Sequence, residues 1–165
     1  FDVVVNIQGD EPFIQPSQLE VIKSCFEDDK TQIATLVKPF TEESSFEALQ
    51  NINSPKVVVD KDMNALYFSC SIIPYQRYVD TKDWLKNHTY YKHIGLYAYR
   101  GEVLKEITSL PQSSLEIAES LEQLRWLENG YKIKVGVSDV ETIGIDTPQD
   151  LQRAEMFLKT INTDK

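Results

Sequence analysis

Two aspartates that each follow a short apolar run are the residues best suited to bind a metal ion. Asp10 follows Val3-Val4-Val5 and Gly9, and Asp146 follows Ile143-Gly144-Ile145. In open α/β sheets, ligands collect beyond the carboxyl ends of the strands. Mg²⁺ typically takes one or two carboxylates there, together with waters and substrate phosphates. The pair therefore indicates a magnesium site, and the alternative is that each aspartate only caps a turn or a helix start.

The strand before Asp10 has to position the first of these carboxylates. Its unbroken run, Val3-Val4-Val5, is typical of a strand buried on both faces, and a strand at the edge of the sheet is the alternative. A doubly buried strand needs neighbours on both edges, yet the chain opens with Phe1. We therefore expect the natural chain to extend further toward the N-terminus.

The rest of the chain alternates between strand and helix patterns, which predicts an α/β fold. We expect strands at 32–38, 56–60, 65–69, 90–100, 131–137 and 142–145, with 56–69 forming a β-hairpin that makes the sheet mixed. A helix is expected to begin at Ser17, with Ser17 and Glu20 as its capping box. Further helices are expected at 44–50, at 101–107, from 113 or 114 to 128, and from 147 to about 161, whereas 76–89 lacks a period and is predicted to be a mobile loop.

The charge balance limits the classes of partner. The 165 residues carry 17 Lys and Arg against 26 Asp and Glu, a net charge of −9. Such a surface repels nucleic acid and anionic lipid, so an anionic substrate needs a local cation or a metal. No apolar stretch approaches the length of a membrane span. Cys25 and Cys70 are the only cysteines, which favours reduced thiols and a cytoplasmic protein.

Five short motifs, in order along the chain, resemble one enzyme family. They are Asn6-Ile7-Gln8-Gly9-Asp10-Glu11-Pro12, Ala65-Leu66-Tyr67-Phe68-Ser69, His93-Ile94-Gly95-Leu96-Tyr97, Leu121-Glu122-Gln123-Leu124-Arg125 and Gly144-Ile145-Asp146-Thr147-Pro148. Together they resemble the CMP-Kdo synthetases, or 3-deoxy-manno-octulosonate cytidylyltransferases. The likeness covers essentially the whole chain.

The resemblance implies a nucleotide-diphospho-sugar transferase (Rossmann-like) fold with a mixed sheet. Residues 1–165 would be the C-terminal portion of a single catalytic domain, N-terminally truncated, because the family's basic, glycine-containing nucleotide loop does not occur in this sequence. The family further implies CTP and Kdo (3-deoxy-manno-octulosonate) as substrates, Mg²⁺ as cofactor, a homodimer, and a role in lipopolysaccharide biosynthesis.

Carried over residue by residue, the resemblance makes Asp10 and Asp146 the catalytic Mg²⁺ carboxylates and places Gln8 at the active-site turn. His93, Tyr97, Glu122 and Gln123 match positions that line the Kdo pocket. Without the resemblance, His93 and Tyr97 would be interpreted as structural strand residues. Glu122 and Gln123 would then be a solvated helix face, with side chains about a quarter turn apart.

One position departs from the family pattern. After Tyr67-Phe68-Ser69 the family has an arginine that meets the sugar acid, and here Cys70 stands in its place. A thiol cannot make the planar, two-pronged contact of a guanidinium with a carboxylate. Arg77 and Lys92 are near enough in sequence to be considered as compensating cations.

Two alternative functions stay open at this stage. The first is a cytidylyltransferase for another acidic sugar, such as a sialic acid, although the Leu121–Arg125 motif argues against it. The second is a folding or dimerisation module without activity, because the nucleotide loop is absent from the sequence.

Overall fold

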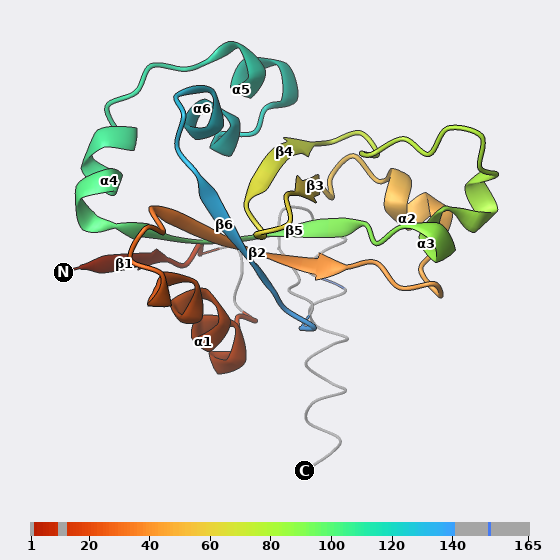
Figure 1. Cartoon of the computed structure of the whole chain (residues 1–165), viewed down its shortest axis with the longest axis horizontal. Coiled ribbons are helices and arrows are strands. Elements are labelled where there is room, and N and C mark those ends of the chain that lie inside the picture. Colours follow the sequence, from red (N-terminus) through yellow and green to blue (C-terminus); the bar gives the residue numbers. More distant parts are fainter. Residues whose placement is uncertain (1, 10–12, 141–151, 153–165) are drawn as a thin grey trace.

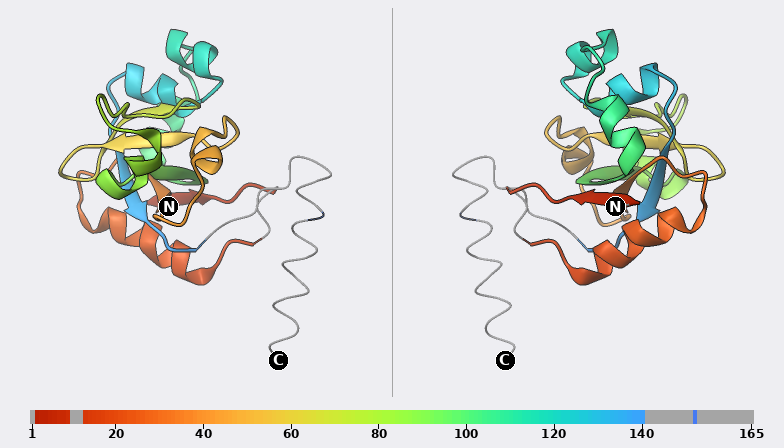
Figure 2. Two further views of the ribbon diagram at one scale, coloured as in Figure 1. Left: turned by 90° about the vertical axis from the view of Figure 1, so that its right-hand side faces the viewer. Right: turned by 90° about the vertical axis from the view of Figure 1, so that its left-hand side faces the viewer.

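A mixed sheet of six strands with helices on both faces makes up the protein (Figures 1 and 2). The computed structural model describes residues 2–9, 13–140 and 152. The strand order is β4 (Ala65–Ser69), β3 (Lys56–Val59), β5 (Tyr91–Arg100), β2 (Ile33–Pro39) and β6 (Ile133–Val137). Only β2 and β6 are parallel among these pairs, so the mixed α/β sheet predicted from the hairpin pattern is confirmed.

The first strand, β1 (Val3–Asn6), lies at an edge rather than inside the sheet. It pairs antiparallel with the end of β5, from Val3 opposite Arg100 to Asn6 opposite Tyr97, and with no other described strand. Val5 is 40% exposed. The prediction of a doubly buried strand is therefore wrong for the described residues, because the apolar run reports strand propensity but not how many neighbours the strand has.

Helices cover the two faces of the sheet (Figure 2). On one face lies α1 (Pro16–Ser24), which buries Ile22 against Ala34 and Leu36 of β2. A side chain at Gly136 of β6 would come within 2.8 Å of Val21 Cγ1 and 2.9 Å of Leu36 Cδ2, so this glycine lets α1 approach the sheet.

The opposite face carries the larger core and the elements nearest the predicted site. Here α4 (Gly101–Ile107) packs on β5, α6 (Gln123–Glu128) packs on β4, and α5 (Ser114–Glu119) packs on α6. Trp126 of α6 is buried in a core that includes residues of β2 and β6. At the far end of β5, α2 (Phe46–Gln50) and α3 (Trp84–Asn87) enclose a third apolar cluster of Leu49, Trp84 and Tyr90.

Three local predictions are wrong. The cap of α1 is Gln15, whose side chain and that of Gln18 form the capping box, so Ser17 lies inside the helix. The segment 76–89 is not a plain loop: it contains a 3₁₀ turn and α3, and Trp84 is 3% exposed. The helix predicted from 113 or 114 to 128 is divided into α5 and α6.

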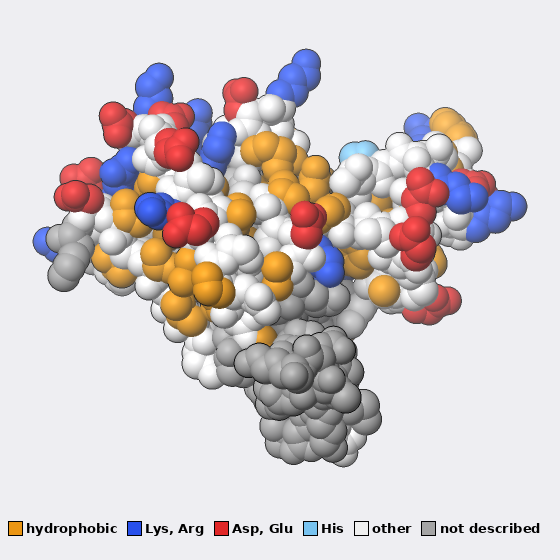
Figure 3. Space-filling view, turned by 90° about the horizontal axis from the view of Figure 1, so that it is seen from below, with side chains coloured by type: hydrophobic (Ala, Val, Ile, Leu, Met, Phe, Trp, Pro, Cys, Tyr) orange, Lys and Arg blue, Asp and Glu red, His pale blue; other side chains and the backbone are white. Residues whose placement is uncertain are grey.

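The predicted strand at 142–145 and the helix from 147 lie outside the described residues. No helix in the described ranges is long and apolar enough to cross a bilayer. On the face seen in Figure 3, Lys and Arg side chains are mixed with Asp and Glu side chains instead of forming a basic stripe, which agrees with the net charge of −9.

Candidate active site

The structure places five of the seven predicted site residues. Asp10 and Asp146 lie outside the described residues, so their predicted meeting around Mg²⁺ is untested. Gln8 follows β1 and its side chain is exposed. The other four lie on β5 and at the start of α6.

A bulge in β5 brings His93 and Tyr97 together. Thr35 of β2 is opposite Tyr97, yet the next residue, Leu36, is opposite Ile94, so Gly95 and Leu96 of β5 have no partner on β2. Residues four apart in a regular strand are separated by about 13 Å. Here the His93 and Tyr97 rings are in contact, with centroids 5.3 Å apart, so the bulge brings two of the predicted pocket residues together.

Burial sets the protonation of both rings. His93 packs edge-on against Phe68, and burial lowers its pKa to about 4, so the imidazole is neutral at pH 7. Burial also raises the pKa of Tyr97 well above its usual value, which keeps the phenol protonated. The Tyr97 hydroxyl is buried, and no described residue meets hydrogen-bond geometry with it, although the Thr35 hydroxyl lies near it and slightly opposes the rise in its pKa. The two side chains can therefore offer a ligand hydrogen bonds but no charge.

Thr35 belongs to the same group, and sequence reasoning missed it. Its hydroxyl oxygen lies 3.0 Å from Nε2 of His93. It also lies 2.9 Å from the carbonyl oxygen of Leu96 and 3.2 Å from that of Ile94, while the side chain is fully buried. A threonine inside a strand is ordinary in sequence, so only the bulge reveals this contact.

A short turn between α5 and α6 positions Glu122 and Gln123. Ser120 ends α5 in the left-handed conformation, with φ 56° and ψ 40°. Glu122 is exposed, whereas Gln123 is 5% exposed and its Nε2 has no hydrogen-bond partner in the described part of the chain. The two side chains diverge, as their adjacent positions predicted.

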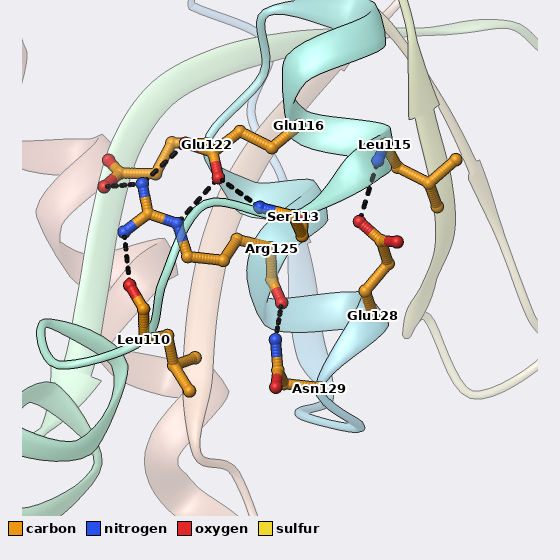
Figure 4. Close-up of polar contacts among 8 residues, drawn as sticks. All are labelled: Leu110, Ser113, Leu115, Glu116, Glu122, Arg125, Glu128 and Asn129. Atoms are coloured by element: carbon orange, nitrogen blue, oxygen red, sulfur yellow. Dashed lines mark hydrogen bonds and ion pairs between the residues drawn. The ribbon is translucent and has the colours of Figure 1, made fainter.

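Arg125 holds this turn in place (Figure 4). Its Nε donates to Glu116 Oε2 at 2.7 Å and its Nη1 to the carbonyl of Leu110 at 3.3 Å. Its Nη2 forms ion pairs with Glu116 and, at 3.5 Å, with Oε1 of Glu122. The guanidinium thus links α5, α6 and the segment before them, and hydrogen bonding to Arg125 lowers the pKa of the Glu116 carboxyl.

Glu122 faces a hollow of about 360 Å³ between β1 and the helices. Val4, Val5 and Asn6 of β1 line it, together with Tyr99 and Trp126. His93, Tyr97 and Gln123 are not among its lining residues, but the Tyr97 ring contacts Trp126 with centroids 5.2 Å apart. Glu122 therefore lies at this hollow, whereas His93 and Tyr97 lie outside its lining and adjoin it through Trp126.

The position that departs from the family pattern is a turn held by a half-buried carboxylate and a buried lysine. Oε2 of Glu119 accepts from the Cys70 N–H at 2.9 Å, and Oε1 of Glu119 accepts from Ser69 Oγ at 2.7 Å. Lys56 is fully buried and donates from Nζ to the Cys70 carbonyl at 2.7 Å. Burial raises the pKa of the Cys70 thiol, so Cys70 supplies no charge. Both cysteines are free.

The two cations considered as substitutes are not placed at this turn. Arg77 is exposed and its guanidinium lies 4.7 Å from the centre of the Tyr78 ring. Lys92 is half-buried on β5, where it pairs across the strands with Lys56 and Lys38. Among residues 2–9, 13–140 and 152, no group of three or more His, Cys, Asp or Glu side chains could hold a metal ion.

Comparison with known sequences identifies the family. The family model described as cytidylyltransferase matches residues 1–133. The chain is 80% identical over 96% of its length to the 3-deoxy-manno-octulosonate cytidylyltransferase of Bacteroides thetaiotaomicron, covering 64% of that protein. It is 56% identical to the enzyme of the same name from Porphyromonas gingivalis, over 96% of this chain and 62% of that one.

Solved structures show the same fold. A CMP:2-keto-3-deoxy-manno-octonic acid synthetase in complex with CTP matches with a TM-score of 0.84 and 37% identity, over 96% of this chain and 62% of that one. A glucose-1-phosphate thymidylyltransferase from Bacillus anthracis, described as putative and solved with sucrose, matches in fold, with a TM-score of 0.54 and 18% identity over 94% and 54% of the two chains. The predicted Rossmann-like fold of nucleotide-diphospho-sugar transferases is thereby confirmed.

The chain spans just under two thirds of the length of the curated relatives it matches. The matched family model nevertheless covers most of the chain, including β1, the bulge in β5 and the turn before α6. The chain belongs to the cytidylyltransferase family.

Proposed function

We propose that the protein transfers the cytidylyl group of CTP to Kdo, giving CMP-Kdo and pyrophosphate for lipopolysaccharide biosynthesis. The observation that carries this proposal is the 80% identity, along 96% of the chain, to an enzyme named for that reaction. The CTP bound to the synthetase of similar fold supports the choice of nucleotide.

In the proposed reaction, the anomeric hydroxyl of Kdo attacks the α-phosphorus of CTP. A bond forms between the sugar oxygen and phosphorus, the bond to the bridging oxygen breaks, pyrophosphate leaves, and the hydroxyl proton is released. Such transfers depend mainly on positioning and on countercharge. Gln8, His93, Tyr97, Glu122 and Gln123 are proposed to bind and orient the substrates.

Countercharge has to come from outside the His93 and Tyr97 pair, because both side chains are neutral at pH 7. We propose that Asp10 and Asp146 hold Mg²⁺, since carboxylate oxygens are the hard ligands this ion prefers. When bound, Mg²⁺ would neutralise charge between the two anionic reactants. We also propose a homodimer and a cytoplasmic location, the latter supported by the two free cysteines.

Titration calorimetry with CTP, with and without Mg²⁺, tests the proposal first. We expect Mg²⁺-dependent binding, followed by turnover when Kdo is added. Asp10→Asn and Asp146→Asn should each lower the turnover rate about a hundredfold or more. The matched control is Asp139→Asn, an exposed aspartate in the described part of the chain. Near-normal turnover in both site variants would contradict the metal assignment.

The two alternatives give different results in the same assays. A cytidylyltransferase for another acidic sugar would turn over a sialic acid faster than Kdo when CTP is held constant. A folding or dimerisation module would bind no CTP. This alternative is kept because the chain spans only 64% of the length of the relative from Bacteroides thetaiotaomicron. Sedimentation tests the homodimer, which would have twice the 19.0 kDa of one chain.

A further inference from the structure

The contact between His93 and Tyr97 depends on two residues of β5 that have no partner on β2. The pairing with β2 passes from Tyr97 directly to Ile94, so Gly95 and Leu96 lack the regular backbone pairing with that strand. The carbonyl groups of Ile94 and Leu96 both approach one atom, the hydroxyl oxygen of Thr35. Thr35 therefore lies at the centre of the bulge.

The hydrogen-bond donors and acceptors around the Thr35 hydroxyl determine which His93 nitrogen carries the proton. The Thr35 hydroxyl has one proton, and its two carbonyl neighbours, at 2.9 and 3.2 Å, can only accept. Since the proton points toward the carbonyls, the third contact, at 3.0 Å to Nε2 of His93, requires Nε2 to be the donor. The reverse arrangement would turn the threonine lone pairs toward two carbonyl oxygens.

A neutral imidazole that donates from Nε2 has an acceptor at Nδ1. The burial that lowers the pKa of His93 keeps the ring neutral near pH 7. Nδ1 makes no hydrogen bond to another described residue. The buried hydroxyl of the adjacent Tyr97 also lacks a partner at full hydrogen-bond geometry among the described residues, although the Thr35 hydroxyl is near enough to favour the ionised phenol slightly. An acceptor and a donor thus lie on rings in contact, a combination that matches a hydroxyl group, which both donates and accepts.

We propose that Thr35 is a positioning residue that holds His93 beside Tyr97 as its Nε2–H tautomer, so that Nδ1 accepts a hydrogen bond from a hydroxyl of the sugar acid. The sugar acid as ligand rests on the proposed function, whereas the tautomer and the bulge do not. Thr35 touches no substrate in this arrangement and acts only through His93.

Nitrogen-15 NMR of the labelled chain at pH 7.5 tests the tautomer directly. The chain has two histidines, and His88→Gln leaves the signals of His93 alone. We expect His93 to be predominantly the Nε2–H form in the wild type and in Thr35→Ser, which keeps the hydroxyl. Thr35→Val keeps the shape but removes the acceptor, so the Nδ1–H form should rise to a comparable population.

Thr31→Val is the matched control, because Thr31 is also buried but lies before β2 and away from His93. It should leave the His93 tautomer unchanged. A predominant Nδ1–H form in the wild type, or an unchanged tautomer in a folded Thr35→Val, would overturn the role of Thr35. If Thr35→Val does not fold, the wild-type tautomer and its retention in Thr35→Ser decide the question.

Titration with Kdo tests the ligand. We expect Kdo to shift the His93 nitrogen signals, and Thr35→Val to weaken Kdo binding about two- to tenfold, the range of one hydrogen bond, without changing CTP affinity. Unchanged His93 signals at saturating Kdo would overturn the sugar-acid contact. Absence of any Kdo binding would count against the proposed function as well, while the tautomer measurement would still decide the role of Thr35.

Discussion

The charge of His93 links one residue to the stability of the whole fold. Its pKa is about 4 in the folded chain and about 6.5 in an unfolded one, so the unfolded state binds more protons between these values. Stability should therefore be complete above about pH 6.5 and should fall as the pH drops toward 4. The full shift corresponds to a loss of up to about 3 kcal/mol.

Urea unfolding between pH 7.5 and 4.5 checks this prediction. His93→Gln, which cannot titrate, should flatten the pH dependence in this window, and His88→Gln should not. The carboxyl of Glu116, whose pKa is lowered, loses its contribution at more acidic pH and so does not confuse the comparison. An equally steep loss of stability in His93→Gln would show that another group is responsible.

At the scale of elements, the break between α5 and α6 decides where Glu122 and Gln123 lie. Leu121 donates its N–H to the carbonyl of Glu116, and Arg125 reaches back across the break to the Glu116 side chain. Ser120 takes the left-handed conformation that this reversal requires. The position of the predicted pocket residues is therefore set by contacts between two short helices, not by one continuous helix.

The backbone at Ser120 provides a direct test of this turn. A β-branched side chain is strained at positive φ, so Ser120→Val should lower the free energy of unfolding by about 1–2 kcal/mol. Ser120→Gly, which adopts this conformation freely, should unfold at the same or a higher denaturant concentration. Denaturant melts of the two variants make the comparison. Equal destabilisation by glycine and valine would mean that the Ser120 side chain, not its conformation, stabilises the turn.

This break also shows where prediction from sequence stopped. Residues 113–128 contain no Gly or Pro and read as one amphipathic helix, because the ion pair between Glu116 and Arg125 that accompanies the break is tertiary. The hairpin of β3 and β4 was predictable, since local alternation and a polar turn determine it. The bulge in β5 was not, because it depends on Thr35 of another strand.

At the scale of the whole molecule, the fold class was predictable from the sequence, whereas the position of an individual strand in the sheet was not. The interleaved strand and helix patterns predicted the mixed α/β sheet, and it is confirmed. The five motifs identified the family. The contact between His93 and Tyr97 was not predicted, because it depends on the bulge in β5. The edge position of β1 was only the alternative in the sequence analysis, because apolar residues do not report how many strands lie beside them.

The net charge of −9 belongs to the whole chain and should slow the association of CTP at low salt concentration. CTP is itself an anion, so the long-range field of the chain opposes its approach, and salt screens that field over about 10 Å at 0.1 M. At saturating Mg²⁺, raising the salt concentration from about 20 to about 200 mM should therefore speed CTP association about two- to tenfold. Stopped-flow fluorescence of the two tryptophans measures this rate. A protein that captures anions with a basic surface shows the opposite trend, so slower association at high salt would indicate that a local cationic site, not the net charge, governs the encounter.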